Sequence, residues 1–142
     1  NKEFYCMSNE KELEIFAKNW IGFYRYKACL TAIYKHQPIG FATLFLMPYK
    51  KVAHLAMIQI IVDEQFQRRG VGASLLKNIE YQAKNHFKLD SIHLEVMEDS
   101  PIEKLLNKTH YKVLFEQEDF YYVKNTFRSR VIYEKGLEGI KV

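Results

Sequence analysis

One segment of this chain, residues 52–87, constrains the fold more than any other. A nearly continuous apolar stretch, 52–62, runs through a basic, glycine-containing turn directly into a long amphipathic pattern, 72–87. The apolar residues of that pattern recur at helical spacing: Leu75, Leu76, Ile79, Ala83 and Phe87. A long apolar run before a turn is typical of a strand that is covered on both faces. The segment therefore predicts a buried strand, a tight turn and a helix in direct succession.

The rest of the chain predicts further strands and two more helices. β-Branched, aromatic and apolar residues predominate in the segments expected as strands: 4–7, 28–34, 39–47, 91–97, 112–123 and 128–135. A hairpin turn is expected at 35–38, and a first helix around 13–20. A short helix is expected from Pro101, capped by Asp99 or Ser100. This order predicts an α/β (α+β) fold, with a mixed sheet and helices on its faces.

Composition and charge exclude several classes of protein. The chain has 142 residues, 48% of them hydrophobic, so we expect one compact core and a single domain over 1–142. A start at Asn1 rather than Met is what a fragment of a longer chain would show. Without a run of about 20 apolar residues or a signal-like N-terminus, we expect a soluble, cytoplasmic protein that does not bind membranes. The net charge of +4 is mixed with acidic residues, which disfavours nucleic-acid binding.

The cysteines and histidines give no sign of a metal site. Cys6 and Cys29 lack the paired spacing of zinc ligands. The five histidines also show no ligand spacing: His36, His54, His86, His93 and His110. We therefore expect no bound metal.

The turn between the strand and the helix carries the chemistry. The first N–H groups of a helix have no partner within it and lie at the positive end of the helix dipole, so they attract phosphate or pyrophosphate. Gly70 and Gly72 let the backbone approach such an anion closely, while Arg68 and Arg69 add positive charge. The turn therefore predicts a polyphosphate ligand.

Two common polyphosphate motifs do not fit this turn. A Walker A loop needs Lys and then Ser or Thr after its last Gly, whereas Ala73 follows Gly72 here. A dinucleotide fingerprint needs a third small residue where Leu75 stands, and it belongs on the first strand of a βαβ unit. ATP or GTP in a Walker loop and NAD or FAD are therefore disfavoured.

Residues on both sides of the turn form one pattern. Its members are Val62-Asp63, Gln67, Gly70, Gly72, Leu75-Leu76 and Leu94-Glu95-Val96. This pattern resembles the acetyl-CoA signature of the GNAT acetyltransferase superfamily, Q/R-x-x-G-x-G/A, with its preceding strand and following helix. The likeness covers about residues 27–123, and it is close to bacterial ribosomal-protein alanine N-acetyltransferases.

The resemblance implies a fold, a reaction and a set of contacts. The fold is a mixed, mostly antiparallel sheet of about six to seven strands that splays at its centre, with helices on both faces. The reaction is N-acetyl transfer from acetyl-CoA, as co-substrate, to a primary amine of a small molecule or peptide, by direct attack in a ternary complex. The residues implied to bind the cofactor are Ile60, Ile61, Val62, Gln67, Arg68, Arg69, Gly70, Val71, Gly72, Ala73 and Ser100.

The resemblance also points to candidates for catalysis. Glu95 matches a carboxylate proposed as the general base in the alanine acetyltransferases. Ser100 stands where the family has an Asn that contacts the cofactor. In the segment 105–111, no tyrosine aligns with the family's general-acid Tyr. Tyr111, another tyrosine or water would then have to protonate the departing thiolate. Because a thiol has a pKa of about 8.5, coenzyme A can also leave without full protonation.

Two other functions stay open at this point. A non-catalytic module that binds acyl-CoA would account for the missing Tyr and the replaced Asn. A nucleic-acid-binding domain would use Arg68, Arg69 and nearby lysines, although one arginine pair is a small footprint. The acceptor amine and the choice between monomer and homodimer are also left open.

Overall fold

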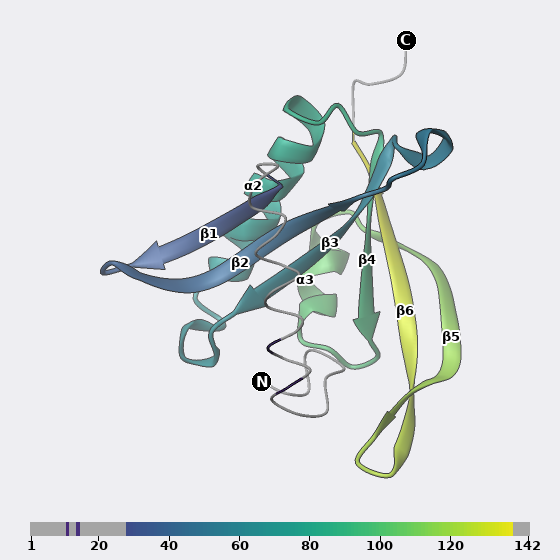
Figure 1. Cartoon of the computed structure of the whole chain (residues 1–142). Helices are drawn as coiled ribbons and strands as arrows, with labels where there is room; N and C mark the ends of the chain where they lie inside the picture. Colours follow the sequence, from purple (N-terminus) through teal and green to yellow (C-terminus); the bar gives the residue numbers. More distant parts are fainter. Residues whose placement is uncertain (1–10, 12–13, 15–27, 138–142) are drawn as a thin grey trace.

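Six strands form one sheet in the computed structural model, which describes residues 11, 14 and 28–137 (Figure 1). In chain order they are β1 (Cys29–Tyr34), β2 (Gln37–Leu46), β3 (Leu55–Val62), β4 (Ser91–Met97), β5 (Lys112–Val123) and β6 (Thr126–Gly136). Their order across the sheet is β1-β2-β3-β4-β6-β5, and β3–β4 is the one parallel pair among them. This confirms the predicted mixed, mostly antiparallel sheet.

The parallel pair at the centre of the sheet stays together over a short distance. Its register covers Leu55↔Ser91, Ala56↔Ile92 and Met57↔His93. Beyond these residues β3 continues to Val62 and β4 to Met97, and Figure 1 shows the two strands diverging. The sheet is therefore splayed at the carboxyl ends of its parallel strands, which is the edge where ligands enter open α/β sheets.

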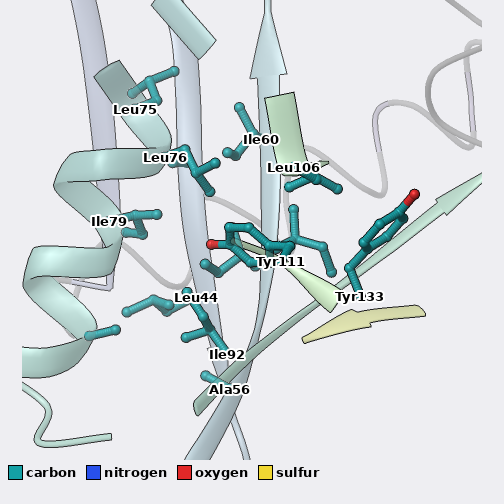
Figure 2. Packing of buried hydrophobic residues seen from close by; sticks show 14 of the residues in the cluster. Leu44, Ala56, Ile60, Leu75, Leu76, Ile79, Ile92, Leu106, Tyr111 and Tyr133 are labelled. Atoms are coloured by element: carbon teal, nitrogen blue, oxygen red, sulfur yellow. The ribbon is translucent and has the colours of Figure 1, made fainter. Parts of the chain in front are cut away.

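The crossover helix α2 (Val71–Asn85) packs against the sheet by one face. The buried residues of this face recur at helical spacing: Leu75, Leu76, Ile79 and Ala83. Figure 2 shows the leucines and isoleucine of this face near Leu44, Ile60 and Ile92 of the sheet. Because burying a leucine or isoleucine side chain contributes about 1.5–3 kcal/mol, this stripe stabilises the packing of the helix against the sheet.

A second helix, α3 (Ile102–Lys108), adds Leu106 to the same buried cluster. α2 and α3 therefore share one core. The prediction of helices on both faces also depends on the segment around 13–20, of which the structure describes only Glu14. Glu14 and the nearby Lys11 are both helical and exposed. The strand predicted at 4–7 lies outside the described residues.

Two strand boundaries differ from the sequence prediction. The first hairpin turns at Lys35 and His36, because both adopt positive φ (47° and 66°) and Gln37 already pairs with Tyr34. The third strand begins at Leu55 instead of 52, because the chain first forms a 3-10 turn, η2 (Lys50–Val52). Local turn geometry shortens the loop in the first case and the strand in the second.

The cap predicted for α3 is wrong. Pro101 occupies the N-cap, and among the described residues no side chain caps this helix. The Asp99 carboxylate instead accepts a hydrogen bond from Arg128 at 3.1 Å, and the Ser100 carbonyl accepts one from the Glu103 N–H at 3.1 Å. The ion pair with Arg128 thus engages the Asp99 side chain, which local propensity had predicted as the helix cap.

Candidate functional site

The amino end of α2 holds a row of unpaired backbone donors. Gly70 is the N-cap, with a φ of 82°, and no side chain of the described residues caps the helix. The first hydrogen bond of the helix runs from the Ser74 N–H to the Gly70 carbonyl, at 3.0 Å. Within the described part of the chain, no N–H from Arg68 to Ala73 donates to a carbonyl or a side chain. These amides are available to an anion.

Two side chains of the turn form hydrogen bonds with its backbone. Asp63 caps a short 3-10 helix, η3 (Glu64–Phe66), by accepting a hydrogen bond from the Gln65 N–H at 2.9 Å. Gln67 donates its side-chain amide to the Val62 carbonyl at 3.1 Å. Gln67, a candidate for cofactor contact, therefore ties the turn to the end of β3.

Two arginines border the open amides. Arg68 has a positive φ of 62°, which sharpens the turn. The Arg69 guanidinium lies 5.7 Å from the centroid of the Phe66 ring, and Phe66 contacts the ring of Tyr34 at 5.6 Å. Neither arginine forms an ion pair with a carboxylate among residues 28–137, so both charges can act on a bound anion.

The space over the turn is open. A Cβ placed on Gly70 would meet no atom of the described residues within 4 Å. A Cβ placed on Gly72 would touch Val62 Cγ2 at 3.8 Å, which is ordinary contact. Both glycines therefore leave room in which a ligand can approach the backbone of Val71 and Ala73.

The end of β3 forms one wall of the splay. Ile60 is buried, Ile61 and Val62 are half-buried, and β2 pairs with all three. On β2, Gly40 allows this packing, because a Cβ there would lie 2.9 Å from the Ile61 carbonyl oxygen and 3.0 Å from Leu75 Cδ1. Gly40 was not predicted from the sequence, although a lone glycine within a strand pattern indicates close backbone approach.

Ser100 lies across the splay, in the turn that follows β4. Its N–H donates to the Met97 carbonyl at 3.2 Å. Its hydroxyl makes no hydrogen bond within the described residues. The hydroxyl of this half-buried candidate residue therefore has no partner in the described part of the chain, and the turn geometry by itself assigns it no role.

Glu95 lies on the part of β4 that has left β3, and two side chains hold it. Glu95 Oε1 accepts a hydrogen bond from the Tyr121 hydroxyl at 2.9 Å and another from Arg130 Nη1 at 3.3 Å. The side chains of Glu95 and Arg130 are 29% and 26% exposed. Neither partner was predicted from the sequence, because they follow Glu95 by 26 and 35 residues and reach it through the strand order β4-β6-β5.

Tyr111, the candidate general acid, belongs to a different cluster. It is 5% exposed and lies in the core shown in Figure 2. Its hydroxyl donates to Glu80 Oε1 at 2.8 Å, and Lys135 Nζ donates to the other Glu80 oxygen at 3.0 Å. Burial, and then the neighbouring Glu80, raise the pKa of Tyr111 well above its usual value, which weakens it as an acid. The structure joins Tyr111 to Glu80 and Lys135, and it does not bring Tyr111 to Glu95.

We expect Tyr111→Phe to destabilise the protein while acetyl transfer stays close to the wild-type rate. Loss of the hydroxyl leaves Glu80 Oε1 without its donor, which should cost about 1–2 kcal/mol of unfolding free energy. Because the raised pKa keeps the Tyr111 hydroxyl protonated, this cost should be constant below about pH 9 and shrink above the unfolded-state value near 10. Urea unfolding and thiol release measure the two effects. A large fall in turnover with unchanged stability would instead make Tyr111 catalytic.

Neither a metal centre nor a membrane-spanning helix occurs in the described part of the chain. No group of three or more His, Cys, Asp or Glu side chains there is placed to hold a metal ion. No helix there is long and apolar enough to cross a membrane.

Solved structures share this fold at low sequence identity. A suspected phosphinothricin N-acetyltransferase superposes with a TM-score of 0.85 at 15% identity, over 96% of this chain and 84% of that one. A ribosomal-protein-alanine N-acetyltransferase from Brucella melitensis gives 0.76 at 16% identity, over 88% and 78%. A Salmonella typhimurium protein solved with its cofactor acetyl-CoA gives 0.78 at 11% identity, over 88% and 76%. At these identities the likeness establishes the fold.

The family follows from the sequence comparison. No curated protein sequence matches the chain. The profile of the acetyltransferase (GNAT) family matches residues 1–106, which is most of the chain and includes the turn, α2 and Glu95. This chain therefore belongs to the GNAT family of acetyltransferases.

Proposed function

We propose that this acyltransferase moves the acetyl group of acetyl-CoA to a primary amine of a small molecule or peptide. The supporting observation is the row of open amides from Arg68 to Ala73, between the splayed end of β3 and α2. A diphosphate needs converging N–H donors and positive charge, and this corner of the sheet has both. The proposed reaction is direct attack by the amine in a ternary complex within one domain.

The residues present fit coenzyme A. The space over Gly70 and Gly72 leaves room for its diphosphate beside Arg68 and Arg69. In the proposed complex the residues of the β3 end, 60–62, line the pantetheine arm, and the hydroxyl of Ser100 faces it across the splay. Bound acetyl-CoA supplies the activated acetyl group.

Glu95 is the proposed general base. Amines are protonated near neutral pH, since a lysine-type amine has a pKa near 10.4 and an α-amine one near 8. The acceptor must lose a proton before it attacks, and Glu95 takes that proton, directly or through a water molecule. A backbone N–H near Val62 is proposed to stabilise the negative charge that develops on the thioester oxygen.

Protonation of the departing sulfur is less important for the rate than deprotonation of the amine. A thiol pKa of about 8.5 makes coenzyme A a tolerable leaving group without full protonation. Because the Tyr111 hydroxyl is engaged by Glu80, we propose that water or another tyrosine supplies this proton.

A non-catalytic module that binds acyl-CoA is the second candidate function. It is favoured by the absence of a tyrosine at the family's general-acid position and by the engagement of Tyr111 in the core. Such a protein would keep the open amides of residues 68–73 that bind the diphosphate, but it would not need Glu95 to contact an amine.

A thiol-release screen separates the two functions. The protein is incubated with acetyl-CoA and amino acids, polyamines, aminoglycosides or peptides with a free N-terminus. We expect one class of amine to raise thiol release above the amine-free rate, and the N-acetylated form of that amine to have no effect. Acetyl-CoA binding in calorimetry without release by any amine would favour the binding module. Absence of both binding and release would exclude both functions.

A further inference from the structure

We propose that Arg130 and Tyr121 are positioning residues, which hold Glu95 by one carboxylate oxygen so that the other oxygen receives the proton of the acceptor amine. Both donors converge on Glu95 Oε1, at 2.9 Å from the Tyr121 hydroxyl and 3.3 Å from Arg130 Nη1. Within the described residues, Glu95 Oε2 has no hydrogen-bond or ion-pair partner. Because a carboxylate accepts through both oxygens, Oε2 keeps its full capacity for an incoming ammonium group. The inference rests on the proposed acetyl transfer.

Arg130 is itself held in place. Its Nε donates to Gln117 Oε1 at 2.8 Å, and its guanidinium carbon lies 4.1 Å from the centroid of the Phe120 ring. The Phe115 ring lies at 5.7 Å from the same carbon. A planar guanidinium fixed by a hydrogen bond and by aromatic rings has little freedom left, so its Nη1 group is directed to a fixed point. That point is Glu95 Oε1.

A bulge in β5 brings these side chains together. The register runs from Gln117↔Arg130 to Tyr121↔Arg128, so β5 advances from 117 to 121 while β6 passes from 130 to 128. Asp119, within the bulge, has a positive φ of 52°. Bulges re-aim side chains near functional sites, and this one places Phe120 on Arg130 and the Tyr121 hydroxyl on Glu95.

The contribution of the Glu95–Arg130 ion pair to the free energy of unfolding does not explain why the pair is present. Glu95 alternates along β4 with the buried Leu94 and Val96, so its side chain projects from the face opposite to theirs. The two side chains are only 29% and 26% exposed, and the cost of removing their charges from water offsets much of the attraction between them. A strand bulge, two aromatic rings and a glutamine all support the ion pair, which is the arrangement expected around a carboxylate whose orientation matters.

A double-mutant cycle tests the proposal. Arg130→Gln is expected to lower kcat about 10-fold, because misplacing a reacting group slows the chemical step, with the KM for acetyl-CoA within about twofold. In a Glu95→Gln background the same substitution should change kcat by less than about twofold, because Arg130 acts through Glu95. Arg130→Lys, which keeps the cation, should restore part of the loss.

Tyr121→Phe has a matched control one residue along the strand. We expect Tyr121→Phe to lower kcat about threefold, because it removes one of the two donors to Glu95. Tyr122→Phe removes an exposed hydroxyl that bonds to Asn125 at 3.3 Å, and it should leave kcat unchanged. If Arg130→Gln does not fold, the cycle is run with Tyr121→Phe instead.

The outcomes separate this inference from the proposed function. Equal losses with and without Glu95 would overturn it, because Arg130 would then act on stability or on another group. Full turnover by Glu95→Gln would also overturn it, while acetyl transfer itself stood. Wild-type protein without thiol release from any amine would remove the proposed function and this inference together.

Discussion

Glu95→Gln is expected to lower kcat for acetyl transfer by about 100-fold or more, because general-base assistance contributes roughly 10²–10⁴ in rate. The glutamine oxygen can still accept hydrogen bonds from Tyr121 and Arg130, so the side chain should keep its position and lose its basicity. The affinity for coenzyme A, measured by calorimetry, should not change, because the open amides lie at the end of α2 and not on β4. Steady-state thiol release at saturating acetyl-CoA measures the rate.

The acceptor provides an internal check on this result. An α-amine with a pKa near 8 is more often neutral at the assay pH than a lysine-type amine near 10.4, so it should suffer less from the loss of the base. Glu134→Gln is the matched control: Glu134 lies on β6, pairs with His93 at 3.4 Å and does not contact Glu95. A kcat of Glu95→Gln close to that of Glu134→Gln would contradict the assignment of the base.

Gly70→Val is expected to weaken coenzyme A binding by about 100-fold, which corresponds to the loss of two hydrogen bonds to a charged group at about 1.5 kcal/mol each. Valine does not adopt a φ of 82° without strain of about 1–3 kcal/mol, so the turn should relax and its amides should no longer converge. The fold should persist, because a Cβ at Gly70 meets no atom within 4 Å in the part of the chain that the structure describes. Calorimetry gives the affinity, and urea unfolding gives the stability.

Two variants separate the backbone geometry from a general effect of added bulk. Gly70→Asn should bind more tightly than Gly70→Val, because Asn tolerates the left-handed conformation. Gly136→Val adds the same side chain at another open position without a positive φ, and it should leave affinity unchanged. An unchanged affinity for Gly70→Val would show that the diphosphate binds elsewhere.

Local pattern was enough to predict most elements of the described chain. α2 was predicted from apolar residues that recur at the spacing of a helix. The open amides were predicted from a glycine-containing turn that leads directly into this helix. Errors arose where a distant residue competed with a local preference. Asp99 was predicted to cap α3, but Arg128, 29 residues away, engages its carboxylate.

The sequence by itself determined the strand, turn and helix that present the open amides of residues 68–73, because each element depends on residues within a few positions of one another. Tertiary structure decided the surroundings of the two candidate catalytic residues. Strand order and a bulge bring Tyr121 and Arg130 to Glu95, while packing of α2 buries Tyr111 against Glu80, 31 residues away. Such contacts depend on how a whole sheet pairs and twists, and no short stretch of sequence encodes that pairing.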